Sequence, residues 1–591
     1  MDDFTASASK AGFTMKLWRG ERMCLLGFDV AAPEADLVGF AIECKPPGSK
    51  RFAPLMNRLA FSYDRPLAAA VTGDAQYSSK AAPFQKFRWV HFPFEPKQGL
   101  YAYRATKMHM PEDNVLRAGT SITLKVSLDP VTYAGFVDVG FTRGFASSQA
   151  FRDKFPADAD IDAIGKTIIP SRADDGLGFA KRKGDIYRWM GFEAYDLIFG
   201  MLDEAVADTS ITLDAFAYDL NEPDIVARLE KLGPRLRIIV DDSTTKNKTT
   251  GVVSGHGTPG SNESAAAARL VVTAGADHVH RTHFTGLQHH KVLIASRGGV
   301  PFKVLAGSTN FSFRGLYIQS NNALVFTDPG VAALYQQVFD QSFADPAGFK
   351  KTDLAKKWNL APASATLPAP GVPVHVCFSP HSSSALSLNP VNGAVEQASS
   401  SVFYAVAFLN QIKSGPTKEA FDRLITRPIF SYGISDEAGG MAIKKPDGSI
   451  GLVDFAYLAK NAPEPFKSEW SGGQGINVHH KFVVCDFNLP TAKVFTGSSN
   501  LAPSGESGNG DHLLMIEDRK IATAYAIEAL LVFDHFHFRS TMKAAFALST
   551  TAKKDALKLL KPTALSGKPA WFETYYKEGS QKMKDRQLFV S

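Results

Sequence analysis

Cysteine is scarce in this chain, with four residues among 591. Two of them, Cys377 and Cys485, lie in apolar, strand-like runs, where a thiol behaves as a small buried hydrophobe. So few cysteines exclude a disulfide framework and favour a reducing compartment.

Long hydrophobic runs are absent as well. No apolar stretch approaches the roughly 18 residues that a membrane-spanning helix requires. The opening residues, Met1–Thr5, lack the basic start and apolar core of a secretory signal. We therefore expect a cytoplasmic protein, with peripheral membrane contact, or export without a cleavable signal, as the alternatives.

Neither sign of charge dominates. The 65 lysines and arginines and the 59 acidic residues give a net charge of +6, and the basic residues are scattered. This mild excess suits an anionic substrate, but we find no dense basic stripe with interleaved aromatic residues, which is typical of nucleic-acid binding. Hydrophobic residues make up 45% of the chain, as in ordinary folded proteins, and its length predicts about three or four folding units.

What the chain does contain is a polar pattern of one histidine, one lysine and a Gly-Ser-x-Asn segment, and this pattern occurs twice. Its members are His289, Lys291, Ser308 and Asn310, and then His479, Lys481, Ser498 and Asn500. The displacement along the chain is the same for the histidines and for the lysines (479 − 289 = 481 − 291). The chain is therefore expected to contain two copies of one unit.

In each copy the histidine and the lysine open an apolar run that is typical of a short buried strand. Alternate residues of a strand point to the same face, so the two side chains of each pair point the same way. An imidazole can attack phosphorus or carry a proton, and an ammonium group binds phosphoryl oxygens. The pattern therefore predicts chemistry at a phosphate ester.

The paired pattern resembles the two HKD motifs of the phospholipase D superfamily, which meet across a pseudo-two-fold axis. The resemblance covers roughly residues 186–550. Further matching pieces lie in the second copy: Phe378-Ser379-Pro380, Asn509-Gly510-Asp511, Tyr525-x-x-Glu528 and the run from Asp534 to Arg539. The resemblance implies an α/β fold with two tandem phospholipase D-like α-β-α repeats in pseudo-two-fold arrangement, which share one site at their interface.

After residue 186, a strand at 211–218, a helix at 223–232 and a strand at 236–240 predict a mainly parallel sheet covered by helices.

The chain is expected to divide into six segments. The segments are a β-sandwich-like accessory domain (1–145), a connector (146–185), repeat 1 (186–350), a proline-rich linker (351–373), repeat 2 (374–550) and a tail packed on the catalytic region (551–591).

Residues 1–145 contain several short segments of alternating polarity, including 121–128 and 136–145, separated by turn residues. This arrangement favours an antiparallel β-sandwich. Aromatic residues gather between 87 and 103, and core packing is favoured over a ligand-binding face for them. We find no catalytic constellation here, so this domain is interpreted as a binding or docking module for an unknown ligand or partner.

Two long insertions lie at corresponding places in the copies. Residues 244–264 are expected either to border the mouth of the site or to form a flexible surface insertion. Residues 435–475 carry apolar side chains that could reach a membrane interface or form a closed lid: Phe455, Tyr457, Phe466 and Trp470.

The resemblance also implies the roles of the site residues. One histidine attacks phosphorus and forms a phosphohistidine, while the other protonates the departing alkoxide and then activates the acceptor. The non-bridging oxygens are held by Lys291, Lys481, Asn310 and Asn500, with Ser308 and Ser498 as further hydroxyl donors. Since two of these donors are cationic, neither a metal ion nor another cofactor is expected.

The two copies differ in their acidic residues. Ser296 stands where the second copy has Asp486, and Asp511 follows only the second Gly-Ser-x-Asn segment. Asp511 and Asp486 are the expected orienting residues, and by the resemblance Asp511 holds His479. This favours His479 as the nucleophile and His289 as the acid, with decay of repeat 1 to an inactive copy as the alternative.

The histidines outside the two pairs are interpreted as structural or solvated side chains and not as metal ligands. They are His278, His280, His283, His290, His480, His512, His535 and His537.

Together these observations predict a phosphodiesterase of the phospholipase D type, which hydrolyses or transfers phospholipid headgroups. The alternative is a metal-independent nuclease of the same superfamily that acts on DNA or RNA. A phosphatidyltransferase such as cardiolipin synthase shares the apparatus but normally brings membrane-spanning helices. A pair of inert copies used only for binding is disfavoured, because both His-Lys pairs are intact.

Overall fold

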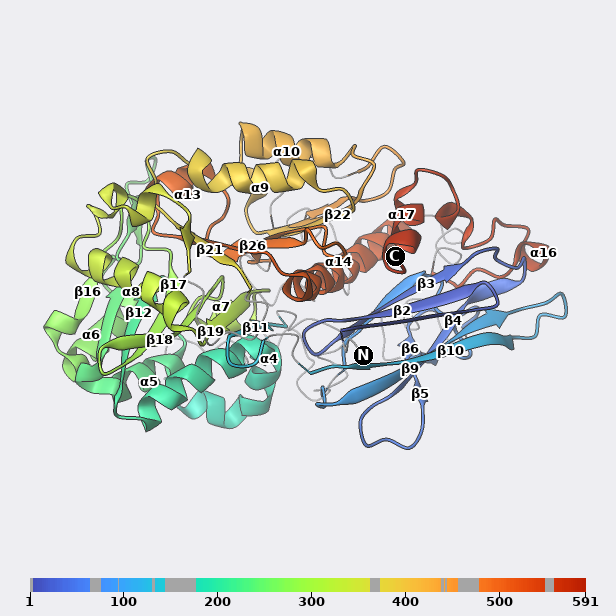
Figure 1. Ribbon diagram of the computed structural model, residues 1–591, viewed down its shortest axis with the longest axis horizontal. Coiled ribbons are helices and arrows are strands. Elements are labelled where there is room, and N and C mark those ends of the chain that lie inside the picture. Colours follow the sequence, from blue (N-terminus) through green and yellow to red (C-terminus); the bar gives the residue numbers. More distant parts are fainter. Residues whose placement is uncertain are drawn as a thin grey trace.

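The computed structural model describes residues 4–63, 76–93, 95–129, 133–143, 177–361, 372–436, 441, 444–454, 478–547 and 557–591. Two four-stranded sheets lie at one end of the molecule, and two larger sheets with their helices lie at the other (Figure 1). Most of the expected connector, part of the linker and the four apolar side chains of the second insertion fall outside the described residues.

The N-terminal strands form two antiparallel sheets. The first contains β1 (Thr5–Lys10), β2 (Phe13–Arg19), β3 (Cys24–Val30) and β8 (Arg88–His91). The second contains β10 (Arg117–Ser127), β9 (Leu100–His109), β4 (Leu37–Lys45) and β5 (Ala53–Pro54), while β6 (Met56–Asn57) pairs with β7 (Tyr77–Ser78). The Phe13 ring of β2 stacks on the Phe40 ring of β4, with centroids 5.5 Å apart, so the two sheets share one apolar core.

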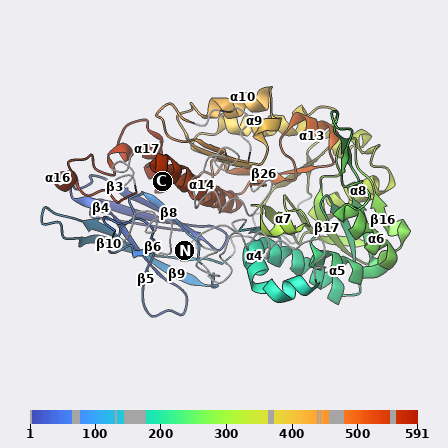
Figure 2. The same cartoon turned by 180° about the vertical axis from the view of Figure 1, so that it is seen from behind.

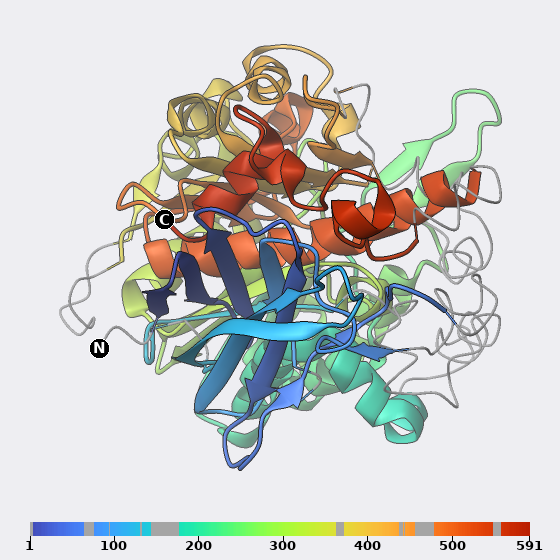
Figure 3. The same ribbon diagram turned by 90° about the vertical axis from the view of Figure 1, so that its right-hand side faces the viewer.

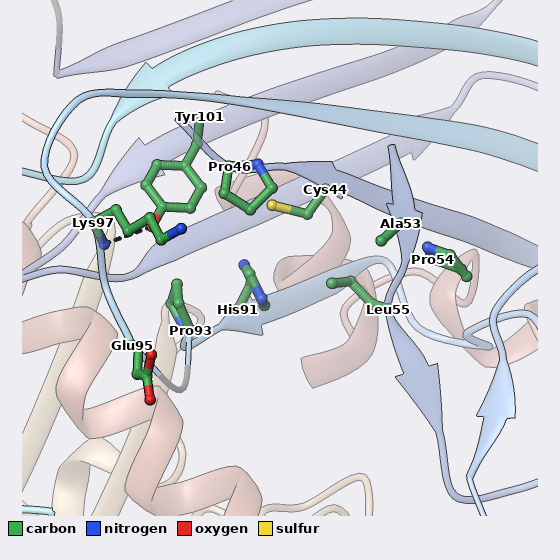
Figure 4. Close-up of a pocket in the computed structure, with 10 residues that line it drawn as sticks. All are labelled: Cys44, Pro46, Ala53, Pro54, Leu55, His91, Pro93, Glu95, Lys97 and Tyr101. Carbon is green, nitrogen blue, oxygen red and sulfur yellow. Dashed lines mark hydrogen bonds between the residues drawn. The ribbon is translucent and has the colours of Figure 1, made fainter. Parts of the chain in front are cut away.

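The aromatic residues of these sheets serve mainly that core. Phe87, Tyr101 and Tyr103 are fully buried, which confirms the prediction of core packing for them. A cavity of about 270 Å³ with a largely apolar lining opens beside Cys44 and His91 (Figure 4). Burial lowers the pKa of His91 to about 4, so this ring is neutral at physiological pH.

The C-terminal segment contains α16 (Thr563–Ser566), η8 (Glu573–Tyr575) and α17 (Gln581–Leu588). The indole Nε1 of Trp18 donates to the carbonyl of Phe589 at 2.9 Å, and Nε2 of Gln581 donates to the carbonyl of Ser431 at 2.9 Å. The tail, expected to pack on the catalytic region, therefore bridges that region and the N-terminal sheets, where Figure 3 shows it in red over the blue strands.

The first large sheet has seven strands. Their order is β11 (Val137–Phe141), β19 (Asn322–Phe326), β18 (Val300–Gly307), β17 (Lys291–Arg297), β12 (Ile211–Ala217), β13 (Leu236–Val240) and β16 (Val279–Arg281). The strand expected in the N-terminal domain at 136–145 is thus an edge strand of this sheet. Its alternating pattern defines a strand but does not define which sheet it joins.

The second large sheet has eight strands. Their order is β20 (Asn359–Leu360), β21 (Val374–Phe378), β27 (His512–Ile516), β26 (Lys493–Gly497), β25 (Lys481–Cys485), β22 (Ser401–Val406), β23 (Phe430–Ser435) and β24 (Leu452–Asp454). From the second position to the eighth, the strands correspond one by one to the seven strands of the first sheet, and the two sets follow the same order along the chain.

The prediction of a mainly parallel sheet is wrong. In the first sheet β12, β13 and β16 are parallel, but β17, β18, β19 and β11 continue the sheet antiparallel. The turn between β17 and β18 is Gly298-Gly299, with φ of 58° and 80°. Two glycines in this left-handed region form a tight hairpin turn, which forces antiparallel pairing.

Each large sheet is covered on its outer face by its own helices (Figures 1 and 2). The first is covered by α4 (Leu177–Ala207), α5 (Pro223–Leu232), α6 (Asn262–Ala274) and α7 (Phe313–Tyr317). The second is covered by α9 (Ala385–Gln397) and α10 (Pro416–Leu424), and α13 (Pro503–Gly508) follows β26. The inner faces share one core with α8 (Pro329–Ala344) and α14 (Arg519–Ala547). The loops at the strand ends of both sheets are thereby brought together.

The first insertion, residues 244–264, contains regular secondary structure. It contains a two-stranded hairpin, β14 (Thr244–Lys246) and β15 (Val253–Gly255), and its last residues begin α6. Residues 244–255 lie at the surface, and the flexibility of this insertion stays a prediction. Of the second insertion, the structure describes only residues at its start and β24.

None of the helices in the described part of the chain is both long and apolar enough to cross a membrane.

Candidate active site

The two large sheets meet at the two predicted histidines. The backbone N–H of His289 donates to the carbonyl of Gly510 at 2.9 Å, and that of His479 donates to the carbonyl of Ser320 at 3.1 Å. Gly510 and Ser320 are separated along the chain by the same displacement as the two histidines (510 − 320 = 479 − 289). Each histidine is thus fixed by a loop of the opposite sheet.

The imidazole ring of each histidine is likewise held by a loop of the opposite sheet. Nδ1 of His289 lies 2.6 Å from Oδ1 of Asp511, and Nδ1 of His479 lies 2.8 Å from Oδ1 of Asn321. All four residues are at most 5% exposed. Asp511 and Asn321 are again separated by the displacement of the histidines (511 − 321 = 479 − 289), so both rings are held in the same way by equivalent positions.

The expected pairing of Asp511 with His479 is wrong. The loop that carries Asp511 crosses to the first sheet, so its carboxylate reaches His289. The partner of His479 is instead the neutral side-chain amide of Asn321. The orientation of this amide is fixed because its Nδ2 donates to the carbonyl of Gly315 at 2.8 Å. The negative charge therefore lies behind His289.

These contacts define the tautomer of both rings. A carboxylate and an amide oxygen can only accept, so Nδ1 carries the proton in each ring and Nε2 keeps its lone pair. Burial lowers the pKa of both histidines, and the charges of Lys291 beside His289 and Lys481 beside His479 lower it further. Without a bound anion, both Nε2 atoms are free of a proton.

The two lysines lie against these histidines. Nζ of Lys291 donates to the carbonyl of His289 at 2.5 Å, and Nζ of Lys481 lies 2.9 Å from the carbonyl and 3.0 Å from Nε2 of His479. Burial lowers the pKa of Lys291 to about 8, and burial together with the charge of Lys291 holds that of Lys481 well below its usual value. An anion between the two groups would favour their charged forms.

The serines of the Gly-Ser-x-Asn segments do not act as the expected phosphate donors. The hydroxyl of Ser308 donates to Oδ1 of Asn321 at 2.9 Å, and that of Ser498 donates to Oδ1 of Asp511 at 2.7 Å. Both hydroxyl groups hold the residues that orient the histidines.

The asparagines of these segments keep part of their expected capacity to bind phosphate oxygens. Nδ2 of Asn310 donates one N–H to Oδ2 of Asp219 at 2.6 Å, which leaves its second N–H for a ligand. The buried Oδ1 atoms of Asn310 and Asn500 have no hydrogen-bond partner among the described residues.

Asp486 does not orient a histidine, contrary to expectation. Its carboxylate accepts the backbone N–H groups of Ser399, Ser400 and Ser401 at 2.7–3.1 Å, where the chain enters β22. Asp486 itself has φ of 54°, in the left-handed region that aspartate and asparagine tolerate. This acid closes a turn at the far end of β25.

Replacing Asp486 by alanine should therefore lower the free energy of unfolding by about 1–3 kcal/mol, because three backbone N–H groups, of which that of Ser401 is buried, lose their acceptor. Asp486→Asn keeps an acceptor oxygen and serves as the matched control with a smaller loss. Urea denaturation measures the stability, and kcat of the folded Asp486→Ala protein should stay within a few-fold of the wild type. A large loss of kcat at unchanged stability would instead indicate that Asp486 orients a histidine of the site.

Sequence reasoning missed a charged network beside His289. Nδ1 of His256 lies 2.8 Å from Oδ2 of Asp241, and its Nε2 lies 3.1 Å from Oδ1 of Asp219. Asp219 holds Asn310, and Oδ1 of Asp241 accepts the N–H of Gln288 at 2.7 Å, just before His289. The network thus positions two members of the first copy.

Asp219, His256 and Glu263 also place possible metal-ligand atoms within 4.8 Å of one another. Burial opposes a charge on His256, but the bonds to Asp219 and Asp241 raise its pKa to about 10. The ring is therefore an imidazolium, and its own positive charge neutralises these carboxylates.

The second sheet repeats one part of this network. Oδ1 of Asp436 accepts the N–H of Val478 at 3.1 Å, just before His479, as Asp241 does before His289. Asp241 follows directly on the strand predicted at 236–240, and that position was the available signal; Asp436 follows directly on β23 as the structure has it. We find no such signal for His256, because it lies in the insertion of the first copy.

The neighbouring histidines are structural, as predicted. His290 and His512 are fully buried and stack with ring centroids 5.6 Å apart, and Nε2 of His480 lies 3.1 Å from Oε1 of Glu528. His283 is exposed. The side-chain surroundings of His537 lie outside the described residues.

Comparison with protein families gives one match. Residues 200–343 match the family model described as "Cardiolipin synthase, PLD-like domain". This stretch runs from the end of α4 to the end of α8 and contains His289, Lys291 and Asn310. No curated protein matches the chain in sequence.

Several solved structures show distant similarity. A phosphatidylserine synthase of Haemophilus influenzae Rd KW20 is 14% identical over 61% of this chain and 92% of its own, with a TM-score of 0.39. A polyphosphate kinase of Porphyromonas gingivalis is 12% identical over 55% of this chain and only 46% of its own, with a TM-score of 0.34. A yeast tyrosyl-DNA phosphodiesterase is 11% identical over 52% of this chain and 83% of its own, with a TM-score of 0.28.

Proposed function

We propose that this chain, which belongs to the phospholipase D superfamily through its residues 200–343, cleaves phosphodiester bonds at the site between its two large sheets. The observation that carries the proposal is the exchange of orienting groups, by which His289 and His479 are each held by the opposite sheet. The matching strand order and the constant displacement between equivalent residues support two tandem repeats in pseudo-two-fold arrangement.

His289 is the nucleophile in this proposal. Its Nε2 lone pair attacks phosphorus, a P–N bond forms, and the bond from phosphorus to the leaving oxygen breaks. The resulting ring is cationic, and the Asp511 carboxylate at 2.6 Å from Nδ1 stabilises that charge. The pKa of Asp511 is held well below its usual range, since the interactions with His289 and Lys291 outweigh the effect of burial, so the carboxylate stays ionised.

His479 is the general acid and base. When a phosphodiester binds, its negative charge favours a protonated His479, whose Nε2–H is given to the leaving alkoxide. The same nitrogen then takes a proton from water or an alcohol, the oxygen of that acceptor attacks phosphorus, and the P–N bond breaks. The neutral partner Asn321 leaves the imidazolium a stronger acid than a carboxylate would.

The remaining donors bind the non-bridging oxygens. Lys291 and Lys481 are buried next to the two rings, where a bound anion favours their cationic forms, and the free N–H of Asn310 is a neutral donor. Such fixed donors act where charge grows in the transition state. They supply the charge that a divalent metal ion supplies in other phosphodiesterases.

The substrate proposed is a phospholipid whose headgroup is released or transferred. The decisive experiment incubates the protein with phosphatidylcholine or phosphatidylethanolamine vesicles, and in parallel with single-stranded and double-stranded oligonucleotides. Headgroup release without nucleotide release supports the lipid substrate, and the reverse result assigns a nuclease. Absence of both products, together with absence of bis(p-nitrophenyl) phosphate hydrolysis, would overturn the proposed chemistry.

Excess EDTA should leave the rate unchanged within experimental error, because lysine and asparagine donors surround the two histidines. The measurement compares initial rates before and after dialysis against chelator. A loss that added Mg²⁺, Ca²⁺ or Zn²⁺ restores would contradict the proposed mechanism.

A further inference from the structure

The hairpin of β14 and β15 stands free of the rest of the molecule. Every residue from Thr244 to Gly255 is exposed, and Figure 3 shows the hairpin, in green, projecting beyond the helices of the first large sheet. Its extended arm from Ser243 to Lys248 can reach up to about 20 Å from its base. An isolated two-stranded hairpin gains little stability by itself, so a free-standing one needs a local device to hold its shape.

That device is the turn. The backbone N–H of Asn247 donates to the carbonyl of Val252 at 2.9 Å, and its Oδ1 accepts the N–H groups of Thr249 and Thr250, each at 2.9 Å. These hydrogen bonds close the turn and define the path of the backbone from which the side chains of the tip project.

The side chains at this tip are of two kinds. Val252 is 61% exposed and Val253 is 49% exposed, although each is a residue that normally gains from burial. Lys246 is the cross-strand partner of Val253, and Lys248 lies in the turn. No acidic residue occurs between Thr244 and Gly255. An apolar pair flanked by cations matches the boundary between the acyl chains and the headgroups of an anionic bilayer.

The base of the hairpin belongs to the site. His256 follows β15 directly, and its ring bonds to Asp219 and Asp241, which hold Asn310 and the backbone before His289. A bilayer in contact with the tip would be separated from these residues by the length of the hairpin. The hairpin therefore couples a surface contact to the site.

We propose that the β14–β15 hairpin docks the protein on an anionic phospholipid surface, with Val252 and Val253 entering the apolar boundary and Lys246 and Lys248 contacting headgroup phosphates. This inference deepens the proposed function, on which its link to catalysis rests. An exposed aliphatic pair gives no gain against the phosphate backbone of a nucleic acid, so the lipid surface is the favoured partner.

The test measures co-sedimentation of the full chain with vesicles. Wild-type protein should bind vesicles of equal parts phosphatidylcholine and phosphatidylglycerol, and should bind phosphatidylcholine alone more weakly. Val252→Asp should weaken binding by about tenfold or more, because a charge replaces a residue that enters the apolar layer. Lys246→Glu together with Lys248→Glu should have an effect of similar size that shrinks as salt is raised.

Matched controls exist in the chain. Val272 is an exposed valine on α6, and Lys50 and Arg51 are adjacent exposed cations beyond β4. Val272→Asp and the double variant Lys50→Glu with Arg51→Glu make the same chemical changes elsewhere and should bind as the wild type does. Thermal melting of each variant verifies that it is folded.

The outcomes separate this inference from the proposed chemistry. The hairpin variants should lose activity on vesicles in parallel with binding while hydrolysing bis(p-nitrophenyl) phosphate at the wild-type rate. Vesicle binding through the hairpin without any diester cleavage would leave the inference standing and reject the proposed function. Equal vesicle binding by wild type and hairpin variants, no vesicle binding by the wild type, or loss only of oligonucleotide binding would overturn the inference.

Discussion

Asparagine in place of His289 is expected to lower kcat by about 10⁴–10⁶-fold, because removing a nucleophile removes the covalent route. His479→Asn should be as inactive on substrates with alkoxide leaving groups. The two variants should differ with bis(p-nitrophenyl) phosphate, since nitrophenolate leaves without a proton. There, His479→Asn should still release one equivalent of nitrophenol and accumulate a phosphohistidine at His289.

The readout is a rapid-quench burst together with mass spectrometry of the peptide that carries the phosphoryl group. His283→Asn, at an exposed histidine near the site, is the matched control and should retain wild-type turnover. A burst in His289→Asn, with none in His479→Asn, would exchange the two roles and restore His479 as the nucleophile.

Asp511→Asn should lower kcat by about 10²–10⁴-fold with little change in KM, because the cationic phosphohistidine loses its counter-charge. The pH profile separates this effect from simple misfolding. Asp511 raises the pKa of His289, so the variant should have a lower pKa at this ring. His289 would then stay neutral to lower pH, and the acid limb of kcat/KM should move to lower pH.

The reciprocal variant Asn321→Asp places a carboxylate behind His479 and should raise the pKa of that ring. The alkaline limb of kcat should then move to higher pH, because the general acid keeps its proton longer. If Asp511→Asn moves the alkaline limb instead, or leaves the profile unchanged, the assignment of the two rings is contradicted.

The local parts of the site could be predicted from the sequence. Strand alternation places His479 and Lys481 on one face and sends His480 to the other, and these are relations between neighbouring residues. The prediction also succeeded for β13, at 236–240, where an apolar run between turn residues forms a buried strand. The constant displacement between the copies even maps Asp511 onto Asn321, which would have identified the partner of the second ring.

The relations between the sheets could not be predicted in the same way. Asp511 follows the second Gly-Ser-x-Asn segment, but its loop crosses to His289, and sequence order does not define which ring a loop reaches. The pairing of β11 with β19 is equally non-local. The Gly298-Gly299 turn was a readable signal for antiparallel pairing, whereas the β-α-β order around α5 describes only β12 and β13.

The reciprocal holding of the two rings has a consequence for any division of this protein. A fragment that ends before Asp511 would keep both His-Lys pairs, yet the Nδ1–H of His289 would have no acceptor. Two separately produced pieces, one for each large sheet, would be inert alone and would regain turnover only on reassociation. A substitution in either loop is therefore expected to impair the histidine of the other sheet.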